Sequence, residues 1–176
     1  MERRVHRSTS SNVLPVITLQ RDCALFRVHP NGGGIVAAGA RVGPEVYVGP
    51  EAVVTGSARV RGDVRIEDQA LVGDRADIYG KVRLSGQARI TGHAKLRGDV
   101  EVSGEALVTD WADILGRARV RGWAKVMGHA RVRGYLVAAH HAVLDGNVVT
   151  DGAVSLDYFV HVSGETHLYG NFRLTA

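Results

Sequence analysis

The sequence has 176 residues, a single cysteine, and a formal net charge of +4 with a pI near 9.6. This length suits one domain, and one cysteine excludes an internal disulfide framework and favours a reducing, cytoplasmic location. No stretch near the N-terminus is long and apolar enough for a signal or membrane segment, so no membrane partner is expected.

The net charge is concentrated at the start of the chain. Residues 1–34 contain five Arg against Glu2 and Asp22, whereas residues 35–176 contain 17 Lys and Arg against 16 acidic residues. A nearly neutral body argues against a uniformly basic nucleic-acid-binding domain. We interpret residues 1–33 as a basic tail with two short capping strands, VLPVITL at 13–19 and ALFRVH at 24–29.

From Val36 to Leu174 an aliphatic residue recurs at every sixth position. Only Ala138 and Thr150 interrupt this series of 24 positions. A smaller residue, usually Ala, precedes each aliphatic residue by two positions, and Gly, Asp or Pro usually follows it by two. The repeating unit is therefore A-x-V-x-G-x, and it predicts one repetitive domain over residues 34–176.

Each position of this unit has a physical reason. Residues two apart on a strand face the same side, so Ala and Val form one buried face. Gly adopts positive φ, Asp tolerates it, and Pro favours turns, so a corner follows each short strand. Strands this short must pair with the coils before and after them. The sequence predicts an all-β, single-stranded parallel β-helix of about eight triangular coils of three hexapeptides each, with a bulge near Ala138.

The segments HPNGGGIVAAGARV (29–42) and VYVGPEAVVTGSARVRG (46–62) carry a resemblance to a known class. They resemble hexapeptide-repeat β-helix proteins of the YdcK-like or "polymer-forming" phage and bacterial kind. This resemblance implies a left-handed coil, whereas bactofilin-type β-helices, which keep a similar Val and Gly rhythm, are right-handed. The period itself does not distinguish the two hands.

With eighteen residues per coil, the side chains on the outside form columns, and the first face has the most apolar one. An exposed apolar column indicates an interface, and we predict self-association there, as a trimer or by end-to-end assembly. The last coil adds apolar residues at a strand edge that another copy could extend. The predicted self-association residues are Val53, Leu71, Leu107, Met127, Val143, Phe172 and Leu174.

The second face has basic residues on every second coil, with Asp77 and Asp113 on the coils between them. One interpretation is charge neutralisation between neighbouring strands, and the other is an anion-binding surface. Aromatic residues that could stack on bases are scarce there, so nucleic acid is not the expected partner. The anion-binding candidates are Arg59, Arg61, Lys95, Arg97, Arg131 and Arg133.

Two corner columns contain aromatic side chains. His93, Trp111 and His129 are eighteen residues apart, as are Trp123, His141 and Phe159, so each set is predicted to stack. Resemblance to hexapeptide acyltransferases makes His140 and His141 the catalytic candidates.

Resemblance to γ-class carbonic anhydrases makes His93 and His129 candidates for metal binding. The position of the third ligand is occupied by Gly134, and the two histidines are two coils apart.

We therefore predict a non-catalytic, self-associating β-helix that serves as a structural scaffold or spacer without a cofactor. Its expected partner is a second copy of itself, with another protein as a further possibility. The alternatives are an acyltransferase-like enzyme with a site at subunit boundaries and a polyanion-binding module.

Overall fold

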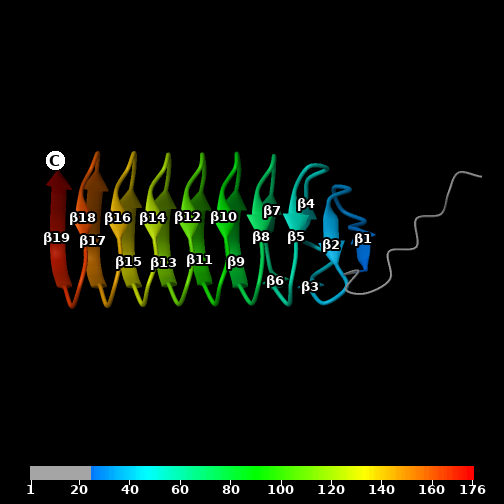
Figure 1. Ribbon diagram of the computed structural model, residues 1–176, viewed down its shortest axis with the longest axis horizontal. Helices are drawn as coiled ribbons and strands as arrows, with labels where there is room; N and C mark the ends of the chain where they lie inside the picture. The colour runs from blue at the N-terminus through cyan, green and yellow to red at the C-terminus, as the bar shows by residue number, and fades with distance from the viewer. Residues whose placement is uncertain (1–24) are drawn as a thin grey trace, which may run out of the picture.

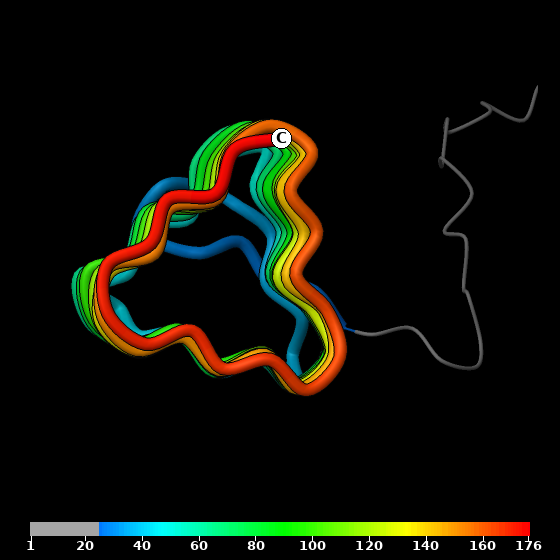
Figure 2. Tube along the Cα trace, turned by 90° about the vertical axis from the view of Figure 1, so that its left-hand side faces the viewer, coloured from blue at the N-terminus to red at the C-terminus, as the bar shows by residue number. Residues whose placement is uncertain are grey.

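The computed structural model describes residues 25–176, and these form a parallel β-solenoid of about eight turns. The coils follow one another along the long axis of the molecule, from the N-terminal coil to β19 (Figure 1). Seen down this axis, successive coils superpose around one interior (Figure 2). Within the described range, no helix is long and apolar enough to cross a membrane.

The strands form two sheets, A and B. Sheet A contains β1 (Phe26–Val28), β2 (Ile35–Ala37), β5 (Val53–Val54), β8 (Leu71–Val72), β10 (Arg89–Ile90), β12 (Leu107–Val108), β14 (Lys125–Val126), β16 (Val143–Leu144) and β18 (His161–Val162). Sheet B contains β3 (Arg41–Val42), β4 (Tyr47–Val48), β6 (Arg59–Arg61), β7 (Val64–Ile66), β9 (Asp77–Leu84), β11 (Lys95–Val102), β13 (Asp113–Val120), β15 (Arg131–Ala138), β17 (Val149–Asp157) and β19 (His167–Thr175).

Each strand from β2 to β17 pairs in parallel with the strand one coil later. The register joins residues eighteen apart, as in Ile90 opposite Val108 and Leu96 opposite Ile114. The predicted parallel β-helix with eighteen residues per turn is therefore confirmed. The predicted bulge at Ala138 is wrong, because β15 and β17 stay in register through Ala138 opposite Leu156.

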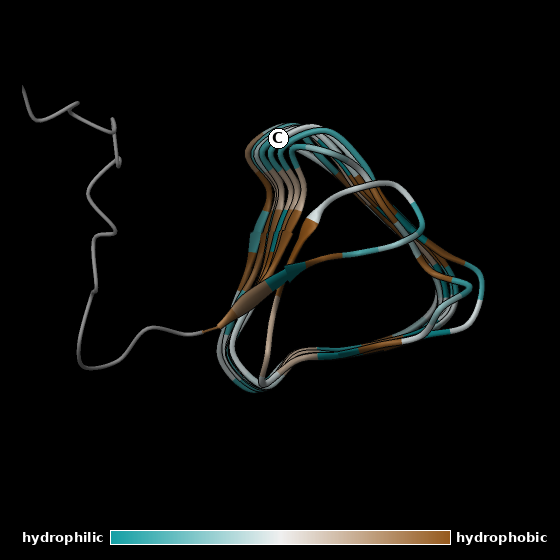
Figure 3. Cartoon of the chain, turned by 90° about the vertical axis from the view of Figure 1, so that its right-hand side faces the viewer, coloured by the Kyte–Doolittle hydropathy of each residue, from teal (hydrophilic) through white to brown (hydrophobic). Residues whose placement is uncertain are grey.

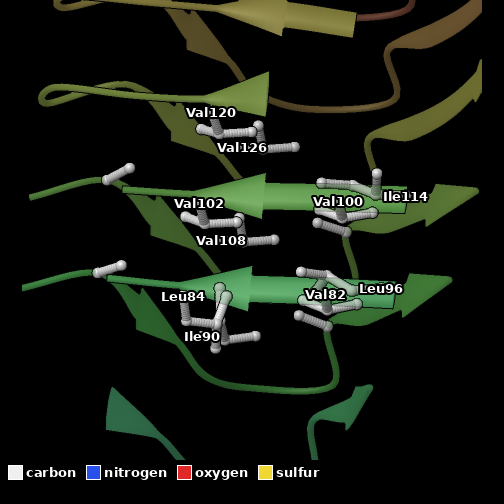
Figure 4. Packing of buried hydrophobic residues seen from close by; sticks show 14 of the residues in the cluster. Val82, Leu84, Ile90, Leu96, Val100, Val102, Val108, Ile114, Val120 and Val126 are labelled. Atoms are coloured by element: carbon white, nitrogen blue, oxygen red, sulfur yellow. The ribbon is translucent and has the colours of Figure 1, made fainter. Parts of the chain in front are cut away.

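The interior is filled by the two alternating positions of the repeat. Aliphatic side chains from successive coils lie above one another and point into the interior (Figure 4). Ala138 and Thr150 are both buried there despite breaking the aliphatic series. Leu136 occupies the position that is usually small, so the Leu136 and Ala138 pair fills its coil in reversed order, large before small, without a change of register.

Three groups of strands, which we call faces, alternate along the chain with short segments, which we call corners, and Figure 2 shows the outline that they form when seen end-on. Face 1 is formed by the strands of sheet A from β2 onward, face 2 by β3, β6 and the first parts of the long strands, and face 3 by β4, β7 and their second parts. Corner B joins face 1 to face 2, corner C joins face 2 to face 3, and corner A leads to face 1 of the next coil. From Gly56 to Gly170 every sixth residue has positive φ.

The corners differ in the φ that they require. At corners A and B φ lies between 53° and 80°, a range that Asp68, Asp74, Asp110, His140 and Tyr158 also adopt. At corner C φ lies between 93° and 126°, a range open essentially only to glycine. Every corner C residue from 62 to 170 is accordingly Gly, and long strands run through this corner.

The N-terminal coil is covered by an antiparallel strand. β1 pairs with β2, with Phe26 opposite Ala37 and Val28 opposite Ile35. The end view in Figure 3 shows this segment crossing the first coil. The strand expected in ALFRVH is therefore present, whereas the one expected at 13–19 lies outside the described residues.

Candidate functional site

The outer surface of face 1 is formed mainly by aliphatic and small side chains. Its first column contains the predicted self-association residues Val53, Leu71, Leu107 and Val143, all half-buried, with Arg89 and Lys125 as the exposed charged positions among them. The second column consists mostly of small side chains and ends in Met127, Asp145 and Ser163. Thr91 donates a hydrogen bond to Thr109 across neighbouring coils, with the two Oγ1 atoms 3.0 Å apart. Long charged side chains are therefore sparse on this face.

The two remaining self-association candidates lie on β19. Phe172 is opposite Val154 and 41% exposed, and Leu174 is half-buried opposite Leu156. These residues are not on face 1, so the structure divides the predicted set into a lateral group and an axial group.

Face 3 balances its own charges. Rows of opposite sign alternate along the axis, with Asp99 and Glu101 on β11 and three arginines on the following coil. The ion pairs are Arg117–Asp99 at 3.7 Å, Arg119–Glu101 at 3.6 Å and Arg121–Glu101 at 2.9 Å. All of these side chains are solvent-exposed, so each pair contributes at most about 1 kcal/mol.

Face 2 is not balanced. It has seven basic residues, Arg41 and the six anion-binding candidates, against Asp77, Asp113 and Asp151. Asp77 lies 3.6 Å from Arg61 and 3.8 Å from Arg97. The other four candidates, Arg59, Lys95, Arg131 and Arg133, have no ion-pair partner among residues 25–176. Charge neutralisation between strands therefore accounts for two of the six basic side chains.

A cleft lies where corner B meets face 2. It has a volume of about 420 Å³ and is lined by Ser57, Arg59, Arg75, Asp77 and Lys95. Sequence reasoning missed Arg75 because this residue follows a corner and so lies in a different column from the other basic residues. The sequence did contain a signal for Arg75. It is two positions before Asp77, which the eighteen-residue register places between Arg59 and Lys95.

Further cavities lie at both ends of the solenoid. One of about 620 Å³ at corner A is lined by acidic and amide side chains, among them Glu51, Glu67 and Gln87. Another of about 540 Å³ is lined by His129, Arg131, Asn147, Val149, Glu165 and His167. Arg131 is the anion-binding candidate that this second cavity includes.

His93 and His129 are held apart by Trp111, as the predicted stack requires. The ring centroids of His93 and Trp111 are 4.0 Å apart, and those of Trp111 and His129 are 6.1 Å apart. The two imidazoles therefore lie on opposite faces of the indole and do not share a ligand position. Residues 25–176 contain no group of three or more His, Cys, Asp or Glu side chains that could hold a metal ion.

His140 and His141 occupy different environments at corner A. His141 is stacked between Trp123 and Phe159, with ring centroids 4.9 Å apart on both sides. His140 has φ of 57° and stacks on the ring of Tyr158 at 4.8 Å.

His140 is also bound to an acidic residue. Its Nδ1 lies 2.6 Å from Oδ1 of Asp157, an oxygen that also accepts a hydrogen bond from the backbone N–H of Tyr158. The hydrogen bond with His140 lowers the pKa of Asp157. Of the two catalytic candidates, His140 is thus the one whose imidazole is oriented by a carboxylate, although its side chain is 55% exposed.

Comparisons of the chain with protein-family models, with curated proteins and with solved structures found no match.

Proposed function

We propose that this protein is a rigid, self-associating scaffold and that its copies pack laterally through face 1. We also propose that the solenoid is left-handed, with triangular coils of three hexapeptides. Two features support the coil shape, namely positive φ at every sixth residue and the three-sided outline in Figure 2. The left hand rests on the resemblance of the A-x-V-x-G-x repeat to hexapeptide proteins.

The observation that carries the proposal is the contrast between face 1 and the other two faces. Faces 2 and 3 have rows of Arg, Lys, Asp and Glu side chains, which keep their charged ends hydrated. Face 1 presents half-buried Val53, Leu71, Leu107 and Val143 beside small residues. Burying such a face removes apolar surface from water. The long charged side chains in its first column are Arg89 and Lys125, which must keep their charged ends hydrated at the edge of the contact.

A second copy is the partner that best fits this surface. Successive coils are about 4.8 Å apart, so the side chains of face 1 form ridges at this spacing. A partner that contacts the whole length of face 1 must have ridges at the same spacing, and a second copy does. Eight coils and a face about 15 Å wide give a contact of roughly 600 Å² per copy. This is near the lower end for stable protein interfaces, so the mass of the assembly should be measured over a wide range of concentrations.

The test is a charge placed on face 1. We expect the double variant Leu71→Asp, Leu107→Asp to dissociate the assembly, because each copy would bury two unpaired carboxylates. The matched control is Leu115→Asp, an equal change at a leucine that is 49% exposed on face 2. Sedimentation or light scattering over a concentration series measures the mass, and circular dichroism checks the fold.

Two results would contradict the proposal. One is a wild-type protein that stays monomeric at the highest soluble concentration. The other is an assembly that the face 1 variant leaves intact or that the Leu115 variant disrupts equally.

A further inference from the structure

We propose that the cleft between corner B and face 2 is a binding site for an oxyanion of the phosphate class, held by Arg59, Arg75 and Lys95. This site is independent of face 1 and of self-association. The cleft opens on a different side of the coil, because corner B separates face 1 from face 2.

The first argument is the excess of positive charge around one carboxylate. Asp77 is paired in register with Arg59 on the coil before it and with Lys95 on the coil after it. Asp77 also has Arg61 and Arg97 within 4.0 Å, and Arg75 lies two positions before it on the same coil. Five cations therefore surround a single acidic residue, which leaves an uncompensated charge of +4 among these six residues.

The second argument is that the cations divide into two groups. Arg61 and Arg97 are in contact with the Asp77 carboxylate, at 3.6 Å and 3.8 Å. Arg59, Arg75 and Lys95 line the cleft and have no acidic group within 4.0 Å in the described part of the chain. Asp74 precedes Arg75 in the chain, but its Oδ2 accepts a hydrogen bond from the backbone N–H of Gly92 at 2.8 Å and it forms no ion pair with Arg75. The three cations of the cleft therefore remain available to a ligand.

The third argument is that the ladder fixes these residues in place. The backbone N–H of Arg59 donates to Ala76 at 2.8 Å, that of Arg75 to Gly92 at 2.8 Å, and that of Lys95 to Ala112 at 2.8 Å. The three positions belong to three successive coils, and corner B sets Arg75 to one side of the column that holds the other two. A rigid backbone limits the conformational entropy that is lost on anion binding to that of the side chains themselves.

The ligand class follows from the side chains. Guanidinium groups bind tetrahedral oxyanions through paired N–H donors, lysine adds a point charge, and Ser57 adds a hydroxyl donor at the same cleft. The volume of about 420 Å³ leaves space for water or for the rest of a phosphorylated molecule. The basic row of Arg131 and Arg133 lies two coils beyond that of Lys95, roughly 10 Å away, so a linear polyphosphate could extend along face 2.

The experiment is a titration of the full chain with orthophosphate, monitored by the NMR signals of the backbone amides. The phosphate replaces chloride, so that the ionic strength stays constant. We expect saturable shifts at Arg59, Arg75, Asp77 and Lys95, and a weakening of about tenfold in Arg75→Gln because a charge-assisted contact is lost. The matched control is Arg83→Gln, which removes the same charge from face 3, away from both the cleft and face 1, and should leave the affinity unchanged. Both arginines are exposed, so neither variant should perturb the fold.

A second titration with linear polyphosphate distinguishes a single phosphate group from a chain of them. If the natural ligand is a single phosphate group, the affinity changes little with the length of the polyphosphate, and Arg131→Gln has no effect on it. If it is a chain, affinity rises with length and Arg131→Gln weakens binding. Binding lost in Arg75→Gln supports the site in both cases. Shifts spread evenly over all basic residues, or equal affinity in the Arg75 and Arg83 variants, would overturn it.

Discussion

Replacement of a corner C glycine by alanine tests why corner C requires glycine. The reason is either the positive φ alone or the positive φ together with the close approach of the next coil. Gly134 and Gly170 form a matched pair, since their φ angles are 94° and 93°. A Cβ at Gly134 would be 3.0 Å from the Gly152 nitrogen and closer still to its carbonyl oxygen, whereas a Cβ at Gly170 would meet nothing within 4 Å. The two substitutions differ in this contact.

The magnitude follows from three contributions. Positive φ destabilises the folded state of an alanine variant by about 1–2 kcal/mol. Alanine also lowers the conformational entropy of the unfolded chain, which stabilises the protein by about 0.4–1 kcal/mol. Both contributions are equal at the two sites. Gly134→Ala must in addition displace the backbone of β17, which is held by pairing on both sides, and overpacking of this kind costs about 1–3 kcal/mol. We expect Gly134→Ala to be the more destabilising substitution by about this last amount.

Urea denaturation followed by far-ultraviolet circular dichroism gives the free energy of unfolding of each variant. Gly62→Ala provides an intermediate, because its φ is 94° and its Cβ would lie 2.9 Å from the Gly80 oxygen. It also lies away from the last coil, where fraying could reduce the effect of Gly170→Ala. Equal destabilisation by Gly134→Ala and Gly170→Ala would refute the inter-coil contact and leave φ as the whole explanation.

The remaining predictions concern the core and the contact between His140 and Asp157 at corner A. Leu136→Ala should destabilise the protein by about 2–5 kcal/mol. The double variant Leu136→Ala, Ala138→Leu should cost under about 1.5 kcal/mol, because it restores the small-before-large order at equal side-chain volume, and a large loss in this double variant would show that the reversed order is required. For Asp157, the lowered pKa means that its contribution to stability is present above the unfolded pKa of 3.8 and is lost as pH falls through the folded pKa. Asp157→Asn should therefore melt at a lower temperature than wild type at pH 5.5, and this difference should narrow as the pH falls below 3.8. A difference that stays constant as the pH falls would contradict this.

The hexapeptide repeat predicted the fold because local pattern and long-range structure have the same cause in a solenoid. An aliphatic residue at every sixth position gives each hexapeptide the same strand and corner. With three hexapeptides in each coil, the packing that we favoured, the pairing partners lie eighteen residues apart, as the structure shows. The stacks of His93, Trp111 and His129 and of Trp123, His141 and Phe159 follow from that register and were predicted correctly.

The candidate sites were only partly predictable. The eighteen-residue period shows which residues lie in one column, but it does not show in which direction a long side chain points. The sequence placed six basic residues on face 2, but only the structure distinguishes Arg61 and Arg97, which contact Asp77, from Arg59 and Lys95, which line the cleft with Arg75. These contacts depend on side-chain reach across columns and around a corner, and the period of the sequence contains no information on either.

The sequence by itself thus determined the strands, the core and the register, since all three depend on backbone periodicity. The tertiary structure decided the φ of each corner, the pairing of His140 with Asp157 and the free cations beside corner B. It also placed Leu136 in the space left by Ala138, where the pattern had indicated a bulge. In each of these cases the outcome depends on the packing of neighbouring coils, which is a property of the assembled solenoid and not of a single hexapeptide.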